Sequence, residues 1–401
     1  MGVDISSRAK AFPSSPIRRL TGLSDEAKAR GIKVYHLNIG QPDIPTPECG
    51  LESLKGIKRK YLEYSPSQGY PGVREALSGY YASYGLTVRP DEMIITAGGS
   101  EALLFAFMTC LDPGDEIIVT DPSYANYQSF ARTAGIKVVS IPTDIRSGFA
   151  LPPITSFEDA ITPRTRAILI CNPNNPTGYL YTRDEMLCLR DIVRKHDLFL
   201  FSDEVYREFI YTGEPYVSAL SLEGIEDNVV LIDSVSKRYN ECGIRVGALV
   251  THNAAVRAAA LKFAQARLSP PLLGQIVAEA SVAVSKEYLL ALQEEYRSRR
   301  DCLVGGLNKI PGVFAPMPQG AFYVMVELPV DDAEAFCRWC LTDFQYEGAT
   351  VMMAPGNGFY THPEDGLRQV RMAYVLKKED LEVALKLLAR ALREYPGRLQ
   401  A

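Results

Sequence analysis

Short apolar segments alternate with longer amphipathic ones through the middle of the chain. The apolar segments are too short for helices and consist largely of aliphatic or aromatic residues, as buried strands do. Strands and helices in alternation are typical of an α/β domain with a mostly parallel sheet. We therefore predict a seven-stranded sheet flanked by helices, with strands at residues 93–96, 116–119, 137–140, 167–170, 198–201, 229–232 and 247–250.

The pattern differs at the two ends of the chain. Residues 1–45 show no regular alternation, and we predict an irregular N-terminal arm that contains a short helix at 24–30 and packs with a small domain. Residues 46–284 form the predicted large domain. Residues 285–401 form a predicted smaller α+β C-terminal domain, whose elements are a long helix at 285–307, strands near 321–326 and 369–374, and helices at 332–341 and 378–394.

Composition narrows the classes of protein that fit. A chain of 401 residues with 47% hydrophobic residues buries a large core and is expected to form two domains. The net charge of −5 predicts no binding to nucleic acid or to anionic membranes. No apolar segment approaches the roughly 20 residues that cross a bilayer, and the N-terminus lacks a hydrophobic signal core. With eight scattered cysteines, which we expect to be reduced thiols, the chain is predicted to be cytoplasmic.

The cysteines and histidines do not predict a metal site. Cys337 and Cys340 form a C-x-x-C pair, but no second pair accompanies them and they lie in an amphipathic, helix-like segment. The four histidines have no ligand spacing. We therefore expect no metal.

Polar side chains follow three neighbouring predicted strands. Asn175 follows the strand at 167–170, Asp203 and Tyr206 follow the next, and Lys237 follows the third. The three positions are about 30 residues apart, roughly the length of one βαβ unit. Because ligands of α/β proteins bind beyond the carboxyl ends of the strands, we expect these four side chains to meet in one crevice.

These four groups suit pyridoxal 5′-phosphate. The cofactor needs an amine for a Schiff base, which Lys237 can supply, and an anion beside its ring nitrogen, which Asp203 can supply. Tyr206 and Asn175 can donate hydrogen bonds to the phenolate oxygen of the ring.

Taken in order, these motifs resemble the class I/II aminotransferases, the aspartate-aminotransferase-like family of pyridoxal-phosphate fold type I. The resemblance runs from about residue 38 to residue 374. It implies the predicted mostly parallel sheet with a smaller C-terminal domain, and it implies that Lys237 carries the cofactor as an aldimine. The cofactor-binding residues that it implies in this chain are Gly98, Gly99, Ser100, Tyr124, Asn175, Asp203, Tyr206, Ser234, Ser236, Lys237 and Arg245.

The resemblance also implies a homodimer and a substrate clamp. Tyr64 and Ser269 match family residues that reach the phosphate of the partner subunit. Arg371 matches the arginine that holds the substrate α-carboxylate in a bidentate fork, together with Asn175, and Gly40 belongs to a segment that closes over that carboxylate.

The predicted function is the transfer of an amino group from an L-amino acid to a 2-oxo acid such as 2-oxoglutarate, with Lys237, Asp203 and Tyr206 as catalytic residues. A lyase of the same fold, a carbon–sulfur β-lyase or a cyclopropane-forming synthase, shares every cofactor residue and is the alternative. A non-catalytic effector module is the third hypothesis, but such modules carry an additional basic DNA-binding domain.

The sequence allows more than one class of substrate side chain. Gln265 stands where members that favour acidic substrates have an arginine, and Arg267 could replace it or lie at the surface. Tyr127 stands where some members place a histidine behind the ring-binding aspartate. Ile17 could line an apolar side-chain pocket or pin the arm to the small domain.

Overall fold

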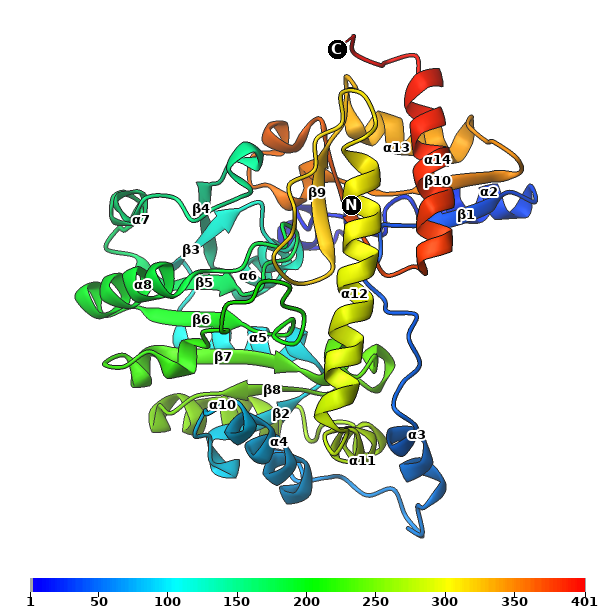
Figure 1. Cartoon of the computed structure of the whole chain (residues 1–401). Helices are drawn as coiled ribbons and strands as arrows, with labels where there is room; N and C mark the ends of the chain where they lie inside the picture. Colours follow the sequence, from blue (N-terminus) through cyan, green and yellow to red (C-terminus); the bar gives the residue numbers. More distant parts are fainter. Residues whose placement is uncertain (1–2, 401) are drawn as a thin grey trace.

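A seven-stranded sheet lies at the centre of the computed structural model, which describes residues 3–400 (Figure 1). The strand order is β2-β8-β7-β6-β5-β3-β4. Strand β8 is antiparallel to both of its neighbours, and the other pairs are parallel, which confirms the predicted fold class. The strands are β2 (Met93–Thr96), β3 (Glu116–Asp121), β4 (Lys137–Pro142), β5 (Thr165–Cys171), β6 (Phe199–Asp203), β7 (Val229–Ser234) and β8 (Gly247–Val250).

The sheet is covered by helices on both faces, which explains why its strands are apolar at successive positions. Ile168 and Leu200 pack in one core with residues of α8 (Arg183–His196), whereas Leu169 and Phe201 pack in another with residues of α5 (Gly99–Cys110). Successive strand residues point to opposite faces, so both faces require apolar side chains here. The remaining helices are α1 (Ser7–Lys10), α2 (Thr21–Ala29), α3 (Glu48–Lys55), α4 (Pro71–Ser83), α6 (Asn126–Ala134), α7 (Ile154–Ala160), α9 (Val235–Arg238), α10 (Ala254–Ala266), α11 (Leu272–Ser281), α12 (Lys286–Leu307), α13 (Ala333–Thr342) and α14 (Lys378–Glu394).

The predicted elements of the C-terminal region are present. Helix α12 runs from the neighbourhood of α11 to that of α14 (Figure 1), and it buries Leu292, Tyr296 and Leu303 on one side. Beyond it, β11 (Ala354–Pro355), β12 (Gln369–Ala373) and β9 (Tyr323–Glu327) form an antiparallel sheet in that order. The division of the chain at residues 45 and 284 stays a prediction.

The N-terminal arm is more regular than predicted. Residues Lys33–His36 form β1, which pairs in parallel with β10 (Ala349–Met352) so that Lys33 faces Ala349. The prediction of an irregular arm was therefore wrong for this segment. Unlike the predicted strands, this segment is not an apolar run, since Lys33 and His36 flank its two apolar residues, and the partner strand lies about 300 residues later, beyond any local sequence signal.

Within residues 3–400, no helix combines the length and the apolar character that crossing a membrane requires.

Candidate active site

A cavity of about 790 Å³ opens beyond the carboxyl ends of β5, β6 and β7. It gathers side chains from the central sheet, from the N-terminus of α5, from the arm and from β12. The predicted site residues that line it are Gly40, Gly99, Ser100, Tyr124, Asn175, Asp203, Tyr206, Ser234, Ser236, Lys237, Arg245 and Arg371. Residues far apart in the sequence therefore meet at the edge of the sheet where α/β proteins bind ligands.

Lys237 lies in the single turn of α9, directly after β7. Ser234 caps this turn by accepting a hydrogen bond of 3.2 Å from the backbone N–H of Ser236. The Nζ of Lys237 donates to the carbonyl of Gly40 at 3.1 Å and lies 3.7 Å from the Sγ of Cys242. No carboxylate among residues 3–400 forms an ion pair with this amine. Lys237 therefore presents an amine to the cavity without a charged partner.

Asp203 ends β6 and is buried, with 8% of its surface exposed. Its Oδ2 accepts a hydrogen bond of 2.8 Å from the hydroxyl of Tyr127, and its Oδ1 accepts a longer one of 3.4 Å from the N–H of Val205. Burial raises the pKa of Asp203 to about 6, and the Tyr127 hydrogen bond opposes that rise. In the described part of the chain no cation pairs with this carboxylate, so a cation in the cavity would stabilise its charged form.

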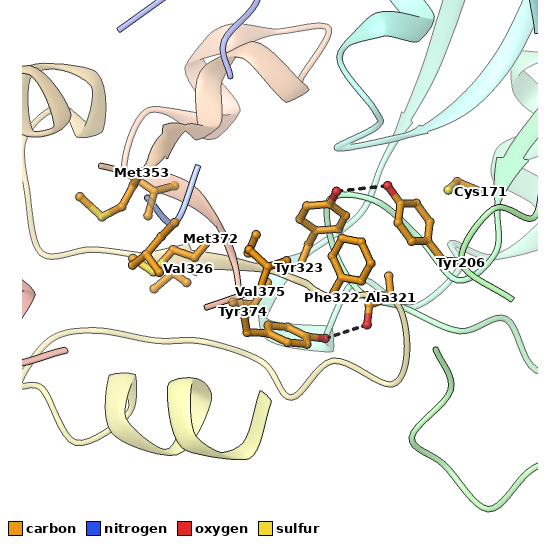
Figure 2. Packing of buried hydrophobic residues seen from close by; sticks show 14 of the residues in the cluster. Cys171, Tyr206, Ala321, Phe322, Tyr323, Val326, Met353, Met372, Tyr374 and Val375 are labelled. Atoms are coloured by element: carbon orange, nitrogen blue, oxygen red, sulfur yellow. Dashed lines mark hydrogen bonds between the residues drawn. The ribbon is translucent and has the colours of Figure 1, made fainter. Parts of the chain in front are cut away.

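Tyr206 and Asn175 form a hydrogen-bonded pair in the cavity wall. Nδ2 of Asn175 donates to the hydroxyl oxygen of Tyr206 at 3.2 Å, and the same oxygen lies 3.2 Å from the hydroxyl of Tyr323 (Figure 2). The ring of Tyr206 packs edge-on against Phe322 with centroids 5.2 Å apart. Burial raises the pKa of Tyr206 well above its ordinary value, so the phenol keeps its proton and can donate it in a hydrogen bond.

Arg371 is a buried cation on β12. Its Nη1 donates to Oδ1 of Asn175 at 3.0 Å, and its Nη2 donates to the carbonyl of Asn38 at 2.6 Å. The guanidinium lies between the rings of Tyr323 and Phe359, at 4.4 and 4.8 Å from their centroids. Burial lowers the pKa of Arg371, and its Nε finds no partner among residues 3–400. A guanidinium buried without a carboxylate is suited to binding a carboxylate ligand.

The N-terminus of α5 and Arg245 form a cradle at another side of the cavity. Gly98 precedes α5 with φ of +83°, where a Cβ would also collide with the guanidinium of Arg245. Arg245 donates to the carbonyl of Ala97 at 3.1 Å. The first N–H groups of a helix, glycine residues that permit close approach, and a guanidinium together fit a phosphate group.

Some predicted residues lie away from this cavity. The side chain of Tyr64 is 76% exposed and Ser269 is half-buried, and neither lines the cavity of its own subunit. Arg267 forms an ion pair of 2.8 Å with Glu101 and donates to the carbonyls of Ser67 and Ile95. It therefore supports the packing of its own chain and does not reach the cavity of that chain.

Ile17 combines the two roles that the sequence left open. It lines the cavity, and it also packs against the cluster of Ala125, Ala354 and Phe359. The arm is thus held against β11 at the same residue that contributes apolar surface to the cavity.

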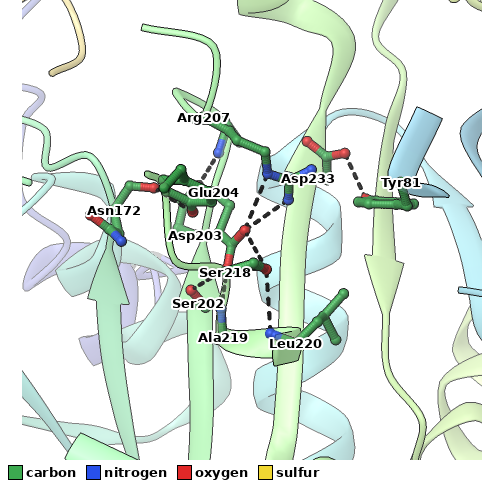
Figure 3. Close-up of polar contacts among 12 residues, drawn as sticks. Tyr81, Asn172, Ser202, Asp203, Glu204, Arg207, Ser218, Ala219, Leu220 and Asp233 are labelled. Carbon is green, nitrogen blue, oxygen red and sulfur yellow. Dashed lines mark hydrogen bonds and ion pairs between the residues drawn. The ribbon is translucent and has the colours of Figure 1, made fainter. Parts of the chain in front are cut away.

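A buried ionic network beneath Asp203 was not predicted (Figure 3). Glu204 is 1% exposed and accepts hydrogen bonds from Ser218, from the N–H of Ala219 at 2.8 Å and from Arg207 at 2.8 Å. Asp233 accepts from Tyr81 at 2.7 Å and pairs with Arg238. These contacts fix the turns that carry Asp203 and Lys237. The network was missed because its members pair with one another only in the folded chain, and neither a family motif nor a local pattern marks these charged residues as buried.

Two residues at the cavity were also missed. Tyr323 belongs to a predicted strand, but nothing in its local sequence indicates that its hydroxyl lies beside that of Tyr206. Arg18 lines the cavity from the arm, where an exposed arginine resembles any surface residue.

Comparison with known proteins agrees with this geometry. The family model described as aminotransferase class I and II matches residues 32–388. The aspartate/prephenate aminotransferase of Thermus thermophilus is 32% identical over 97% of this chain and 98% of its own length. The solved alanine aminotransferase from Pyrococcus furiosus is 32% identical, with a TM-score of 0.88 over 98% of this chain and all of its own. A solved single mutant of the aspartate aminotransferase from Thermus thermophilus gives a TM-score of 0.88 at 31% identity, over 97% of this chain and all of its own.

A family match over most of the chain, together with relatives of this identity and coverage, assigns the reaction class as well as the fold. The chain belongs to the class I and II aminotransferases, and it is an enzyme of transamination.

Proposed function

We propose that this enzyme holds pyridoxal 5′-phosphate on Lys237 and uses it to move an amino group from an L-amino acid to a 2-oxo acid. Members of its family use this cofactor. The observation that carries the proposal is the set of uncompensated charges in one cavity: the Lys237 amine, the buried Asp203 carboxylate and the buried Arg371 guanidinium. Each needs a partner that residues 3–400 do not supply, and the cofactor with its substrate offers all three.

The cradle and the carboxylate would hold the cofactor from opposite ends. Arg245, Ser234 and the first N–H groups of α5 would bind its phosphate, while Asp203 would keep its ring nitrogen protonated. Tyr206 and Asn175 would donate to its phenolate oxygen, and Tyr124 would cover one face of the ring. When bound, the cofactor withdraws electrons from the substrate Cα–H bond and makes that proton acidic.

The protein's own residues then position the substrate and move the proton. Arg371 binds the α-carboxylate through its fork, and Asn175 ties that fork to Tyr206, so the substrate and the cofactor are oriented by one hydrogen-bonded unit. Lys237 would act as the base that takes the proton from the substrate Cα and passes it on within the first half of the transfer, and it would deliver a proton to Cα of the accepting 2-oxo acid in the second half. Gly40, which lines the cavity and whose carbonyl accepts from Lys237, would belong to the segment that closes over the substrate carboxylate.

We further propose that the enzyme is a cytoplasmic homodimer. Tyr64 and Ser269 do not line the cavity of their own chain, and Ser65 donates to the carbonyl of Pro270 at 3.1 Å, so the two segments lie side by side. Tyr61 and Leu62, which precede Tyr64, are 79% and 67% exposed, as residues covered by a second subunit would be in one chain. The eight cysteines form no disulfide in the described residues, which fits a reducing compartment.

Borohydride reduction of the purified holoenzyme, followed by peptide mapping, tests the central assignment. We expect the cofactor on Lys237, and we expect Lys237→Ala to lose transamination, whereas Lys195→Ala, which removes a surface ion pair with Glu158, keeps it. Half-reactions with a panel of amino acids should convert the spectrum of the bound cofactor, and a 2-oxo acid should restore it. Label on another lysine contradicts the assignment. Release of ammonia and a thiol, with the original spectrum restored in the absence of any 2-oxo acid, would indicate a lyase.

A further inference from the structure

The arm places a further arginine at the cavity, beside Arg245 and Arg371, and this arginine has no partner among residues 3–400. Ser15, Ile17 and Arg18 all line the cavity. The next residue, Arg19, is fixed by hydrogen bonding to Asn357 at 2.6 Å and by an ion pair of 2.9 Å with Glu334. Arg18 is exposed, and its guanidinium forms no hydrogen bond or ion pair with any residue from 3 to 400. Two adjacent arginines therefore differ: one anchors the arm, and the other is available to a ligand.

The position of Arg18 is coupled to the clamp for the α-carboxylate. Asn38 accepts a hydrogen bond from Arg371 through its carbonyl and donates one of 2.9 Å from its side chain to the carbonyl of Ile17. Arg18 directly follows Ile17, so the backbone that carries it is held to Arg371 through one residue. Beside Lys237 and Arg245, which belong to the proposed cofactor site, the cavity thus contains two further cations, the buried Arg371 and the exposed Arg18, and neither is paired with a carboxylate of the described chain.

From this pairing we propose that Arg18 binds the distal carboxylate of dicarboxylic amino and 2-oxo acids while Arg371 binds the α-carboxylate. This inference rests on the proposed aminotransferase function and adds a substrate class to it. Arg267 cannot serve the same cavity because Glu101 and two carbonyls already occupy its guanidinium. A guanidinium that forks onto a carboxylate gives this recognition both charge and geometry.

The same surroundings admit apolar substrates. Ile17, Leu103 and Phe130 line the cavity together with Arg18, and a neutral side chain can lie against them. Arg18 is exposed in the absence of a ligand, so it keeps its hydration when no distal carboxylate is present, and a neutral substrate leaves no buried charge unpaired. One cavity can therefore accept an apolar amino donor and a dicarboxylic acceptor in turn.

Binding of two acids of equal carbon number to the holoenzyme tests the proposal without turnover. Glutarate carries two carboxylates and valerate carries one, and their binding is followed by the change in the spectrum of the bound cofactor. We expect Arg18→Gln to weaken the binding of glutarate by about 10- to 100-fold and to leave the binding of valerate unchanged. The affinity of Arg18→Lys for glutarate should lie between those of Arg18→Gln and the wild type. Half-reactions should show the same contrast between glutamate and a neutral amino acid.

Arg19→Gln is the matched control, because it loosens the arm without removing the cation at the cavity. This variant is expected to weaken the binding of glutarate and of valerate to the same extent. If Arg18→Gln also weakens both acids equally, Arg18 only positions the arm and the proposal fails. If glutarate binding is unchanged in Arg18→Gln, the distal carboxylate binds elsewhere and the proposal also fails. Failure of the underlying function would look different, since no amino acid would then convert the cofactor of the wild-type enzyme.

Discussion

The hydroxyl of Tyr127 donates a hydrogen bond of 2.8 Å to Oδ2 of Asp203, and it is the one short hydrogen bond that this carboxylate receives within residues 3–400. Tyr127 is 2% exposed, so no solvent competes for this contact. The hydrogen bond favours the charged form of Asp203, whereas burial disfavours it, and the resulting pKa of about 6 leaves the carboxylate charged at neutral pH.

Removal of this donor should change the pH dependence of cofactor binding. Below its pKa, Asp203 is neutral and does not attract a ring cation, so the affinity of the cofactor-free protein rises as the pH rises through about 6. In Tyr127→Phe the pKa of Asp203 lies higher, and we expect this rise in affinity to move upward by on the order of one pH unit. Titration of the cofactor at a series of pH values measures it. Tyr181→Phe, which removes another buried phenol whose hydroxyl contacts Thr120 and not Asp203, should leave the profile in place.

The stability of Tyr127→Phe should also depend on pH differently from that of the wild type. Because burial raises the folded pKa of Asp203 above that of an unfolded aspartate, ionisation opposes folding, and the cofactor-free protein loses stability as the pH rises between the two values. In Tyr127→Phe this loss continues to a higher pH. Equal profiles for variant and wild type in both measurements would show that Tyr127 does not support the charged carboxylate.

Gly98→Ala should weaken the binding of the cofactor without unfolding the chain. The φ of +83° at this residue disfavours a side chain, and a Cβ would push the guanidinium of Arg245 out of the cradle. We expect at least about a tenfold loss of cofactor affinity, given a strain of roughly 1–3 kcal/mol. Gly79→Ala, in α4 with open space around its Cβ position, is the control and should bind the cofactor normally. Normal binding by Gly98→Ala would exclude the cradle as the phosphate site.

Mixed dimers test whether two subunits share each active site. Tyr64→Phe and Lys237→Ala subunits should each be poor enzymes, but in a mixed dimer one site collects both changes and the other is left intact. Partial activity should therefore return on mixing. A monomer at micromolar concentration, or mixtures no better than their parents, would refute the shared site.

Glu204→Gln should destabilise the fold. Arg207 is 2% exposed and its paired nitrogens both donate to Glu204, so the variant leaves a buried cation without its counter-charge. We expect the variant to lose about 3–5 kcal/mol of the free energy of unfolding, the usual cost of breaking a buried pair. Urea denaturation measures this loss. Glu52→Gln, which breaks the exposed pair with Lys55, should change little. A similar small effect in both variants would mean that the network does not stabilise the turns.

The sequence predicted those site residues that directly follow a strand. The carboxyl ends of parallel strands meet at one edge of the sheet, so the positions of these residues in the fold are known once the strands are recognised. Asp203 and Lys237 were found in this way, and the order of motifs added Arg371 from the far end of the chain. The roles of these residues remain predictions, but the structure brings them to one cavity.

The remaining features depend on contacts between distant segments. Strand β1 exists because β10 offers it hydrogen bonds, and Glu204 is buried because Arg207 and Ser218 surround it. Arg18 is distinguished from Arg19 only because Arg19 finds an anionic partner, Glu334 of α13, and Arg18 finds none among residues 3–400. None of these properties belongs to a local stretch of sequence.

The pairing of β1 with β10 also sets an order of events during synthesis. Lys33 leaves the ribosome early, but Ala349, its partner in the ladder, is added about 300 residues later, which takes roughly 15–60 s at typical elongation rates. The central strands can pair during that interval, whereas the arm cannot. The segment that brings Ile17 and Arg18 to the cavity is therefore the first part of the chain to be made and among the last to reach its place.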